Sequence, residues 1–246
     1  MAYVATIPAT STLEPQDNTR FGNASYTALT EMRRKPNAEE RRRELCDAAI
    51  ELLAEDGARG LTHLRVDRRA GVADGTTSFY FQTRSALLRG ATDRVVQLDV
   101  ADFTAAMNEA KTAQGDKAES LLSQLAEQAM RTAVEPERSR ARARFELLLV
   151  AARDPELSAV FQGLMDQFVA ISEEAVTQLQ PADRPADREL IREQASAVVT
   201  FLGGFLFQLA NGLARLENAK QLEGYRHAVI AGVAAEHPRI RRASLR

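Results

Sequence analysis

Apolar residues recur at helical spacing along most of the chain after residue 36. In the first such segment they stand four, seven and eight positions beyond Leu45, which places them on one face of a helix; they are Ala49, Leu52 and Leu53. No convincing run of alternating β-branched residues is present. The pattern therefore predicts an all-α chain, with helices over residues 37–56, 62–70, 74–81, 85–108, 118–133, 135–152, 155–180, 186–216 and 221–237.

Two polar segments frame the predicted helices. Residues 1–36 are rich in Ala, Thr, Ser, Asn and Pro, a composition typical of a disordered arm. The arm ends in Arg33, Arg34 and Lys35, which either follow a phosphate backbone or form a solvated tail without a role. At the other end, residues 239–246 form a basic tail. We expect the arm to be followed by a first helical domain over residues 37–90 and a second over 91–238.

Two short helices joined by a glycine lie in the segment 62–81. Thr62 is a good N-cap, because its hydroxyl can accept a hydrogen bond from a first-turn amide. Gly71 stands where a residue of positive φ turns the chain, and Val72 follows between the helices. Such a pair is typical of a helix-turn-helix, whose second helix enters the DNA major groove.

This stretch resembles the DNA-binding region of the TetR family of one-component transcriptional regulators. The residues in register with that family are Thr62, Val66, Ala70-Gly71-Val72, Gly75-Thr76, Tyr80-Phe81 and Thr83-Arg84. Three positions depart from it. Ser78 replaces a tyrosine that touches phosphate, Ala73 replaces a serine cap so that Asp74 is expected to cap instead, and Asp67 stands where a small residue is common.

The resemblance implies a three-helix DNA-binding domain followed by a helical domain for ligand binding and dimerisation. Residues at the start of the second short helix are expected to reach base edges, where Thr can bond bases or touch thymine methyls. Tyr80 and Arg84 are expected to hold phosphates and Phe81 to belong to the core. The expected DNA-binding residues are Thr62, Arg65, Asp74, Gly75, Thr76, Thr77, Ser78, Tyr80, Arg84, Arg41 and Arg42.

The distribution of charge and the cysteine content further limit the kinds of partner and site that we expect. Lys and Arg outnumber Asp and Glu by 12 to 9 from Arg33 to Gly90, whereas the ratio is 19 to 22 from Ala91 onward. One cysteine, Cys46, excludes an internal disulfide and is expected to be a packing residue. The histidines form no metal-binding pair, and no signal peptide is visible, so we expect no metal, no cofactor and a cytoplasmic protein.

The segment 194–214 carries no charge over 21 residues, which is long enough to cross a bilayer. It also contains polar residues and small ones such as Gly203 and Gly204, which let a second helix come close. In the TetR family the last two long helices pair with their symmetry mates. We therefore expect a homodimer surface here, with a membrane anchor as the alternative.

Four arginines alternate between residues 138 and 144, and successive ones turn by about 200° on a helix, so they do not predict a second nucleic-acid patch. On the helices that enclose the family's ligand site, the candidate ligand residues are Phe103, Met107, Phe145, Phe161, Met165, Phe168, Phe201, Gln208 and Asn211. Gln208 and Asn211 are the most informative, since buried amides need partners. We predict a ligand-responsive regulator, a repressor released from operator DNA by a hydrophobic small molecule. A helical enzyme is the remaining alternative, although no catalytic arrangement is visible.

Overall fold

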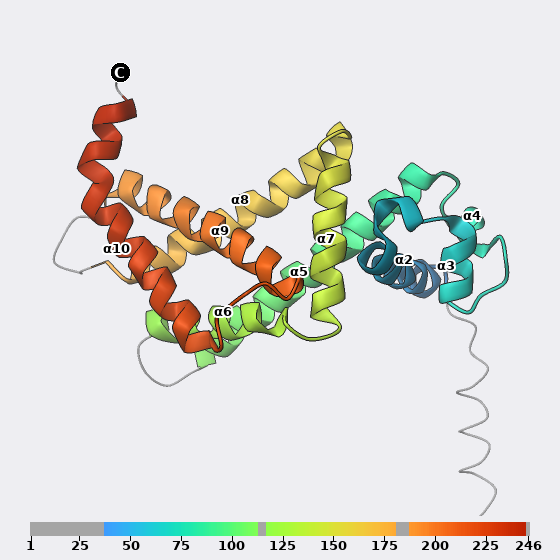
Figure 1. Ribbon diagram of the computed structural model, residues 1–246, viewed down its shortest axis with the longest axis horizontal. Coiled ribbons are helices and arrows are strands. Elements are labelled where there is room, and N and C mark those ends of the chain that lie inside the picture. The colour runs from blue at the N-terminus through green and yellow to red at the C-terminus, as the bar shows by residue number, and fades with distance from the viewer. Residues whose placement is uncertain (1–36, 113–116, 181–186, 245–246) are drawn as a thin grey trace, which may run out of the picture. The chain divides into compact units, whose positions relative to one another are not determined.

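A computed structural model describes residues 37–112, 117–180 and 187–244, which form helices and no strand. The prediction of an all-α fold is confirmed for these residues. The helices are α2 (Ala38–Gly60), α3 (His63–Arg69), α4 (Thr76–Tyr80), α5 (Arg84–Thr112), α6 (Lys117–Arg131), α7 (Glu137–Ala151), α8 (Pro155–Gln178), α9 (Arg188–Ala210) and α10 (Ala219–Ser244) (Figure 1).

The chain divides by its contacts into two units, residues 1–40 and residues 41–246. In the first unit, Asn37 and Glu40 form a reciprocal capping box at the start of α2, with N···O distances of 2.9 and 2.8 Å. The predicted arm over residues 1–36 lies outside the described residues. The domain boundaries expected near residues 90 and 238 stay predictions.

One apolar core runs through residues 41–246 from α2 to α8. It joins Leu45 and Leu53 of α2 and Leu87 of α5 to Leu147 of α7 and Leu164 of α8, all at most 1% exposed. Cys46 belongs to this core as a packing residue, as expected, and its burial raises the pKa of the thiol to about 12. The helix-turn-helix predicted over residues 62–81 therefore shares a continuous core with α7 and α8.

The C-terminal helices α8, α9 and α10 lie side by side (Figure 1). A second apolar cluster joins Phe205 and Leu209 of α9 to Leu222 of α10 and Ala126 of α6. By length and composition α9 could cross a bilayer, and it is the one helix of the described ranges that could. Core helices of soluble proteins pass the same test, so this property alone does not distinguish a dimer surface from an anchor.

Helix α9 ends at Ala210 and not near residue 216 as predicted. Gly212 has a φ of 70°, the amide of Leu213 donates to the carbonyl of Gln208, and the amide of Gly212 donates to Leu209. This is a Schellman-type end, which requires the left-handed conformation that glycine tolerates. The apolar run continues beyond the turn, which is why periodicity alone extended the helix.

Two further helix ends differ from the prediction. Helix α5 begins at Arg84, and the hydroxyl of Thr83 accepts a hydrogen bond from the amide of Ala86, so Thr83 and not Ser85 acts as the cap. Helix α10 continues to Ser244 through part of the segment expected to be a basic tail. Proline at position 238 favoured an earlier end, because it lacks an amide hydrogen.

Candidate functional site

Helices α3 and α4 form the predicted helix-turn-helix. The hydroxyl of Thr62 caps α3 by accepting a hydrogen bond from the amide of Arg65 at 3.3 Å. Gly71 follows α3 with a φ of 66°, and the amide of Val72 closes the turn on the carbonyl of Asp67. The left-handed conformation at Gly71 is the reason this turn needs a glycine.

The carboxylate of Asp67 anchors the start of α4. It accepts hydrogen bonds from the amides of Gly75 and Thr77 at 2.8 and 2.7 Å and from the hydroxyl of Thr77 at 2.5 Å. Asp67 is 1% exposed, although aspartate is seldom fully buried without partners. The expectation that Asp74 caps this helix is wrong, because Asp74 is exposed and Asp67, eight residues before Gly75, supplies the acceptors.

Thr77 does not face outward, contrary to its expected role at base edges. Its side chain is fully buried, and its hydroxyl is bound to Asp67. Helix α4 begins at Thr76, two residues later than predicted, with Gly75 as its N-cap. The hydrogen bonds from the amide and hydroxyl of Thr77 to Asp67 hold this side chain toward the core. The hydroxyl of Thr76 is likewise engaged, donating to the carbonyl of Ala73 at 2.6 Å.

The outer face of α4 is formed by Ser78 and Phe79, and Asp74 is exposed just before the helix. Phe79 is 80% exposed, the most exposed large apolar residue of the described chain, and the sequence analysis did not select it. Its ring meets Tyr80 edge to face at 5.2 Å between centroids. Arg42 lies over the Tyr80 ring at 5.8 Å, while Phe81 is buried as expected. An aromatic ring held in water at this place fits contact with a partner.

We expect Phe79→Ala to weaken operator binding by about 1–3 kcal/mol while leaving the thermal stability nearly unchanged. An apolar ring neutralises no phosphate, so the salt dependence of binding should keep its slope. Fluorescence anisotropy over a salt series measures both quantities. Leu149→Ala, at an apolar residue 65% exposed on α7, is the matched control. Unchanged operator affinity for Phe79→Ala would contradict the outward role of this ring.

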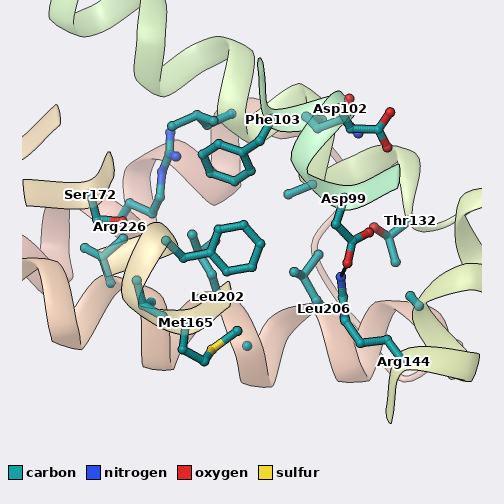
Figure 2. A pocket seen from close by; sticks show the side chains of 18 of the residues that line it. Asp99, Asp102, Phe103, Thr132, Arg144, Met165, Ser172, Leu202, Leu206 and Arg226 are labelled. Carbon is teal, nitrogen blue, oxygen red and sulfur yellow. Dashed lines mark hydrogen bonds and ion pairs between the residues drawn. The ribbon is translucent and has the colours of Figure 1, made fainter. Parts of the chain in front are cut away.

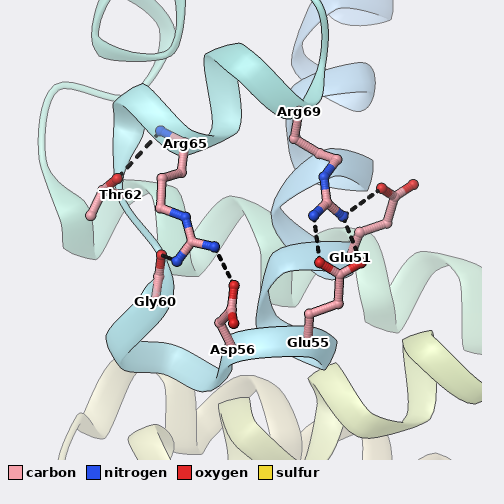
Figure 3. Close-up of polar contacts among 7 residues, drawn as sticks. All are labelled: Glu51, Glu55, Asp56, Gly60, Thr62, Arg65 and Arg69. Atoms are coloured by element: carbon pink, nitrogen blue, oxygen red, sulfur yellow. Dashed lines mark hydrogen bonds and ion pairs between the residues drawn. The ribbon is translucent and has the colours of Figure 1, made fainter.

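Other expected DNA-binding residues already have partners within the protein, and Figure 3 shows those of Arg65. Arg65 pairs with Asp56 and donates to the carbonyl of Gly60 at 2.9 Å. Arg84 donates to the carbonyl of Ala58, and Arg41 pairs with Glu44. These side chains still have exposed surface, so phosphate contact requires them to exchange or share the partners that they have here.

Arg69, which no sequence motif marked, also holds α2 and α3 together. Its guanidinium pairs with Glu51 and Glu55 of α2 (Figure 3). These hydrogen bonds raise the pKa of Arg69, and the bond to Arg69 lowers the pKa of Glu55. Because all three side chains reach solvent, the pairs contribute little to stability but fix where α3 lies on α2.

A cavity of about 250 Å³ lies among helices α5 to α10 (Figure 2). Five of the nine expected ligand residues line it, namely Phe103, Phe145, Phe161, Met165 and Phe168. The rings of Phe103 and Phe168 pack at 5.0 Å between centroids. Apolar residues of α9, including Leu202 and Leu206, complete much of the wall. The cavity therefore suits a ligand with an apolar body.

The other four expected ligand residues do not line this cavity. Met107 packs on Ala110 and Ala175. Phe201 packs near Phe205 and Tyr225. Gln208 and Asn211 are exposed, and the amide of Asn211 donates to the carbonyl of Phe207 at 2.8 Å. The expectation that these two amides are buried was wrong, because helix α9 turns them away from the cavity as it ends.

One end of the cavity is a cluster of charges that the sequence analysis did not assign to the site. Asp99 of α5, 7% exposed, accepts from Arg144 at 2.7 Å and lies 3.3 Å from Arg140. Arg140 also pairs with Asp102. Arg142, which lies between Arg140 and Arg144 in the sequence, donates to the carbonyl of Ala210 at 2.8 Å. Three of the four alternating arginines of α7 therefore bind different partners within the protein.

Helix α7 also contacts the segment that precedes the helix-turn-helix. The carboxylate of Glu146 accepts a hydrogen bond from the amide of Ala58 at 3.1 Å. In addition, an ion pair joins Arg89 of α5 to Glu156 of α8 at 2.8 Å. Glu146 stands two residues after Arg144 of the cavity wall, so helix α7 contacts both the cavity and the residues that precede α3. The described residues hold no group of three side chains suited to a metal ion.

Comparison with known families agrees with this geometry. Residues 45–91 match the family model described as "Bacterial regulatory proteins, tetR family". Residues 116–236 match the model described as "Tetracyclin repressor-like, C-terminal domain". Among curated proteins, none matches the sequence.

Solved structures share the fold at low sequence identity. A transcriptional regulator from Pseudomonas aeruginosa PAO1 has a TM-score of 0.65 and 19% identity, covering 86% of this chain and 98% of that one. A transcriptional regulator from Saccharomonospora viridis in complex with choline has a TM-score of 0.64 and 18% identity, covering 78% and 96%. The multidrug binding protein EbrR, complexed with imidazole, has a TM-score of 0.53 and 24% identity, covering 81% and 96%.

Proposed function

Because this chain belongs to the TetR family of transcriptional regulators, which are non-enzymatic DNA-binding proteins, we propose that it is a repressor released from its operator by a small molecule with an apolar body. The observation that carries the proposal is the course of α5. This helix begins at Arg84, directly after the helix-turn-helix, and bears Asp99 and Phe103 on the cavity wall. One helix therefore belongs to both candidate sites.

For DNA recognition we assign base-edge contact to the exposed side chains of α4, Ser78 and Phe79, with Asp74 just before them. Phosphate contact is assigned to Tyr80 and to Arg42, which lies over its ring. Asp67 and Thr77 take no part in contact. They hold α4 in place and do not themselves distinguish one DNA sequence from another.

For the assembly we propose a homodimer through α9 and α10, which presents two α4 helices to two half-sites about one DNA turn, or a multiple of it, apart. Phe207 of α9 and Tyr225 of α10 are 47% and 55% exposed in the single chain. Regulators of this family are soluble cytoplasmic proteins, and we propose the same location here. In a cytoplasmic protein, the apolar surface of α9 is then covered by a second subunit.

For regulation we propose that a ligand in the cavity displaces α5 and α7 relative to each other. Phe103 and the Asp99 carboxylate come from α5, whereas Arg144 and Phe145 come from α7. Two of the related structures carry small ligands, choline and imidazole, which is consistent with a cavity of this size here. A ligand shifts the equilibrium only by its differential affinity for the two arrangements.

The proposal predicts reciprocal coupling between ligand and operator. A ligand that lowers operator affinity tenfold should itself bind about tenfold, or about 1.4 kcal/mol, more weakly when operator is present. The operator is first isolated by selecting fragments from random DNA with the purified protein. The ligand is then titrated by calorimetry with and without that fragment.

Equal ligand affinity in both titrations, for a ligand whose binding is lost on changing Phe103→Ala, would rule out coupling through this cavity. Failure to select any DNA sequence would instead count against the DNA-binding function. An increase of operator affinity on ligand binding would leave a regulator, but one that the ligand turns on. The selection step thus tests DNA binding, and the two titrations distinguish absence of coupling from coupling of either sign.

A further inference from the structure

His63, the first residue of α3, is hydrogen-bonded to the end of α4. Its Nε2 atom lies 2.7 Å from the carbonyl oxygen of Phe81, which stands 18 residues later in the chain. A carbonyl oxygen can only accept, so Nε2 carries the hydrogen and donates it. Phe81 is the C-cap residue of α4, where carbonyl groups have no partner within the helix. The imidazole therefore binds α4 at the point where this helix ends.

Helix α3 thus holds α4 at both ends. At the start, the carboxylate of Asp67 accepts hydrogen bonds from the amides of Gly75 and Thr77. At the end, His63 donates to Phe81. His63 and Asp67 are four positions apart, so both lie on the same face of α3. A helix of five residues is too short to be stable by itself, so these two contacts decide how it lies on α3.

The end of α4 that His63 holds carries the exposed ring assigned to base contact. Phe79 precedes Phe81 by two residues and is 80% exposed. The Phe81 ring belongs to the apolar core, and the guanidinium of Arg42 lies over it at 5.1 Å from the ring centroid. Phe81 is therefore held by its ring in the core and by its carbonyl at His63. Two attachments at one residue fix the direction in which the neighbouring Phe79 points.

Resting on the proposed function, we propose that His63 is a positioning residue for operator recognition, which sets the angle of α4 on the DNA without touching a base. The neighbouring Thr62 caps α3 and is one of the expected DNA-binding residues. The bond from His63 to Phe81 then joins the start of α3, beside the DNA backbone, to the end of the helix that reads bases. A change at His63 should impair sequence discrimination more than general affinity for DNA.

The test compares specific with non-specific binding of the full chain. An operator is first selected from random DNA with the unmodified protein. Fluorescence anisotropy over a salt series then gives the affinities for that operator and for a scrambled duplex of equal length. His63→Ala should weaken operator binding about tenfold and change binding of the scrambled duplex by less than about twofold. The slope of affinity against salt should stay the same, because no phosphate contact is lost.

Two further variants separate positioning from loss of stability. His63→Gln is the conservative change, since the side-chain amide of glutamine also offers an N–H donor, and it should recover most of the discrimination. Val95→Ala, at a fully buried residue of α5, is the matched control. It should lower the melting temperature at least as much as His63→Ala, yet keep the ratio of the two DNA affinities. His63→Phe keeps a ring without a donor and replaces His63→Ala in the comparison if that variant does not fold.

Equal weakening for operator and scrambled duplex, with a shallower salt slope, would make His63 a phosphate contact and overturn the proposal. Unchanged operator affinity without the donor would show that the hydrogen bond does not position α4. The same loss of discrimination in Val95→Ala would assign the effect to stability. If the unmodified protein selects no DNA sequence, the proposed function itself fails and this role of His63 fails with it, a result that is seen before any variant is compared.

Discussion

Replacing Asp67 by Ala is expected to lower the free energy of unfolding by about 3 kcal/mol and to weaken operator binding strongly. The substitution removes the acceptor of three hydrogen bonds, two from backbone amides and one from the buried hydroxyl of Thr77. Hydrogen bonds to a charged group contribute about 1.5–3 kcal/mol each, and buried donors left without acceptors add a further cost. Helix α4 has only five residues, so it has little else to hold its start.

The measurement is denaturant unfolding together with operator binding. Asp74→Ala is the matched control for stability, because Asp74 is exposed and caps nothing; its change should stay within about 0.5 kcal/mol. Asp67→Asn should fall between, since it keeps one acceptor oxygen and places a donor toward the other amide. A loss below about 1 kcal/mol for Asp67→Ala would mean that water replaces the carboxylate and that Asp67 is not the anchor of α4.

The helix-turn-helix was predictable because its signals are local. The cap at Thr62 and the left-handed turn at Gly71 each depend only on residues within one helical turn in the sequence. Both features are present in the structure. The orientation of Thr77 was not predictable from the same stretch. It depends on a carboxylate ten residues earlier, on another helix, at a position where the family resemblance suggested a small residue. A long-range hydrogen bond leaves no periodic signal in the sequence.

The aromatic lining of the cavity was predicted from the sequence, whereas its charged residues were not. Aromatic residues on α5, α7 and α8 line it as expected, because apolar stripes identify inward faces. Asp99 and Arg226 interrupt such stripes and therefore read as surface residues. Their burial follows from packing between helices that are far apart in the chain. The sequence feature that could have indicated Asp99 is the run of alternating arginines in α7, which needs acidic partners.

The second large effect is expected from a charge on the outer face of α9. A Cβ added at Gly204 meets no atom within 4 Å in the single chain, so Gly204→Glu should fold as well as the unmodified protein. Glutamate is also a better helix former than glycine. If two copies pack through this face, the carboxylate is buried without a partner, which costs several kcal/mol and should split the dimer.

Loss of the dimer should weaken operator binding by about 10²–10⁴-fold, because the second half-site no longer benefits from a tethered partner. Sedimentation equilibrium gives the mass, and anisotropy gives the affinity for the operator. Gly163→Glu is the matched control, since Gly163 lies on α8 and also has open space at its Cβ; it should stay dimeric. A Gly204→Glu protein that remains dimeric and binds operator normally would place the subunit interface elsewhere. A monomer that still binds with full affinity would show that operator recognition does not need two helix-turn-helix units on one particle.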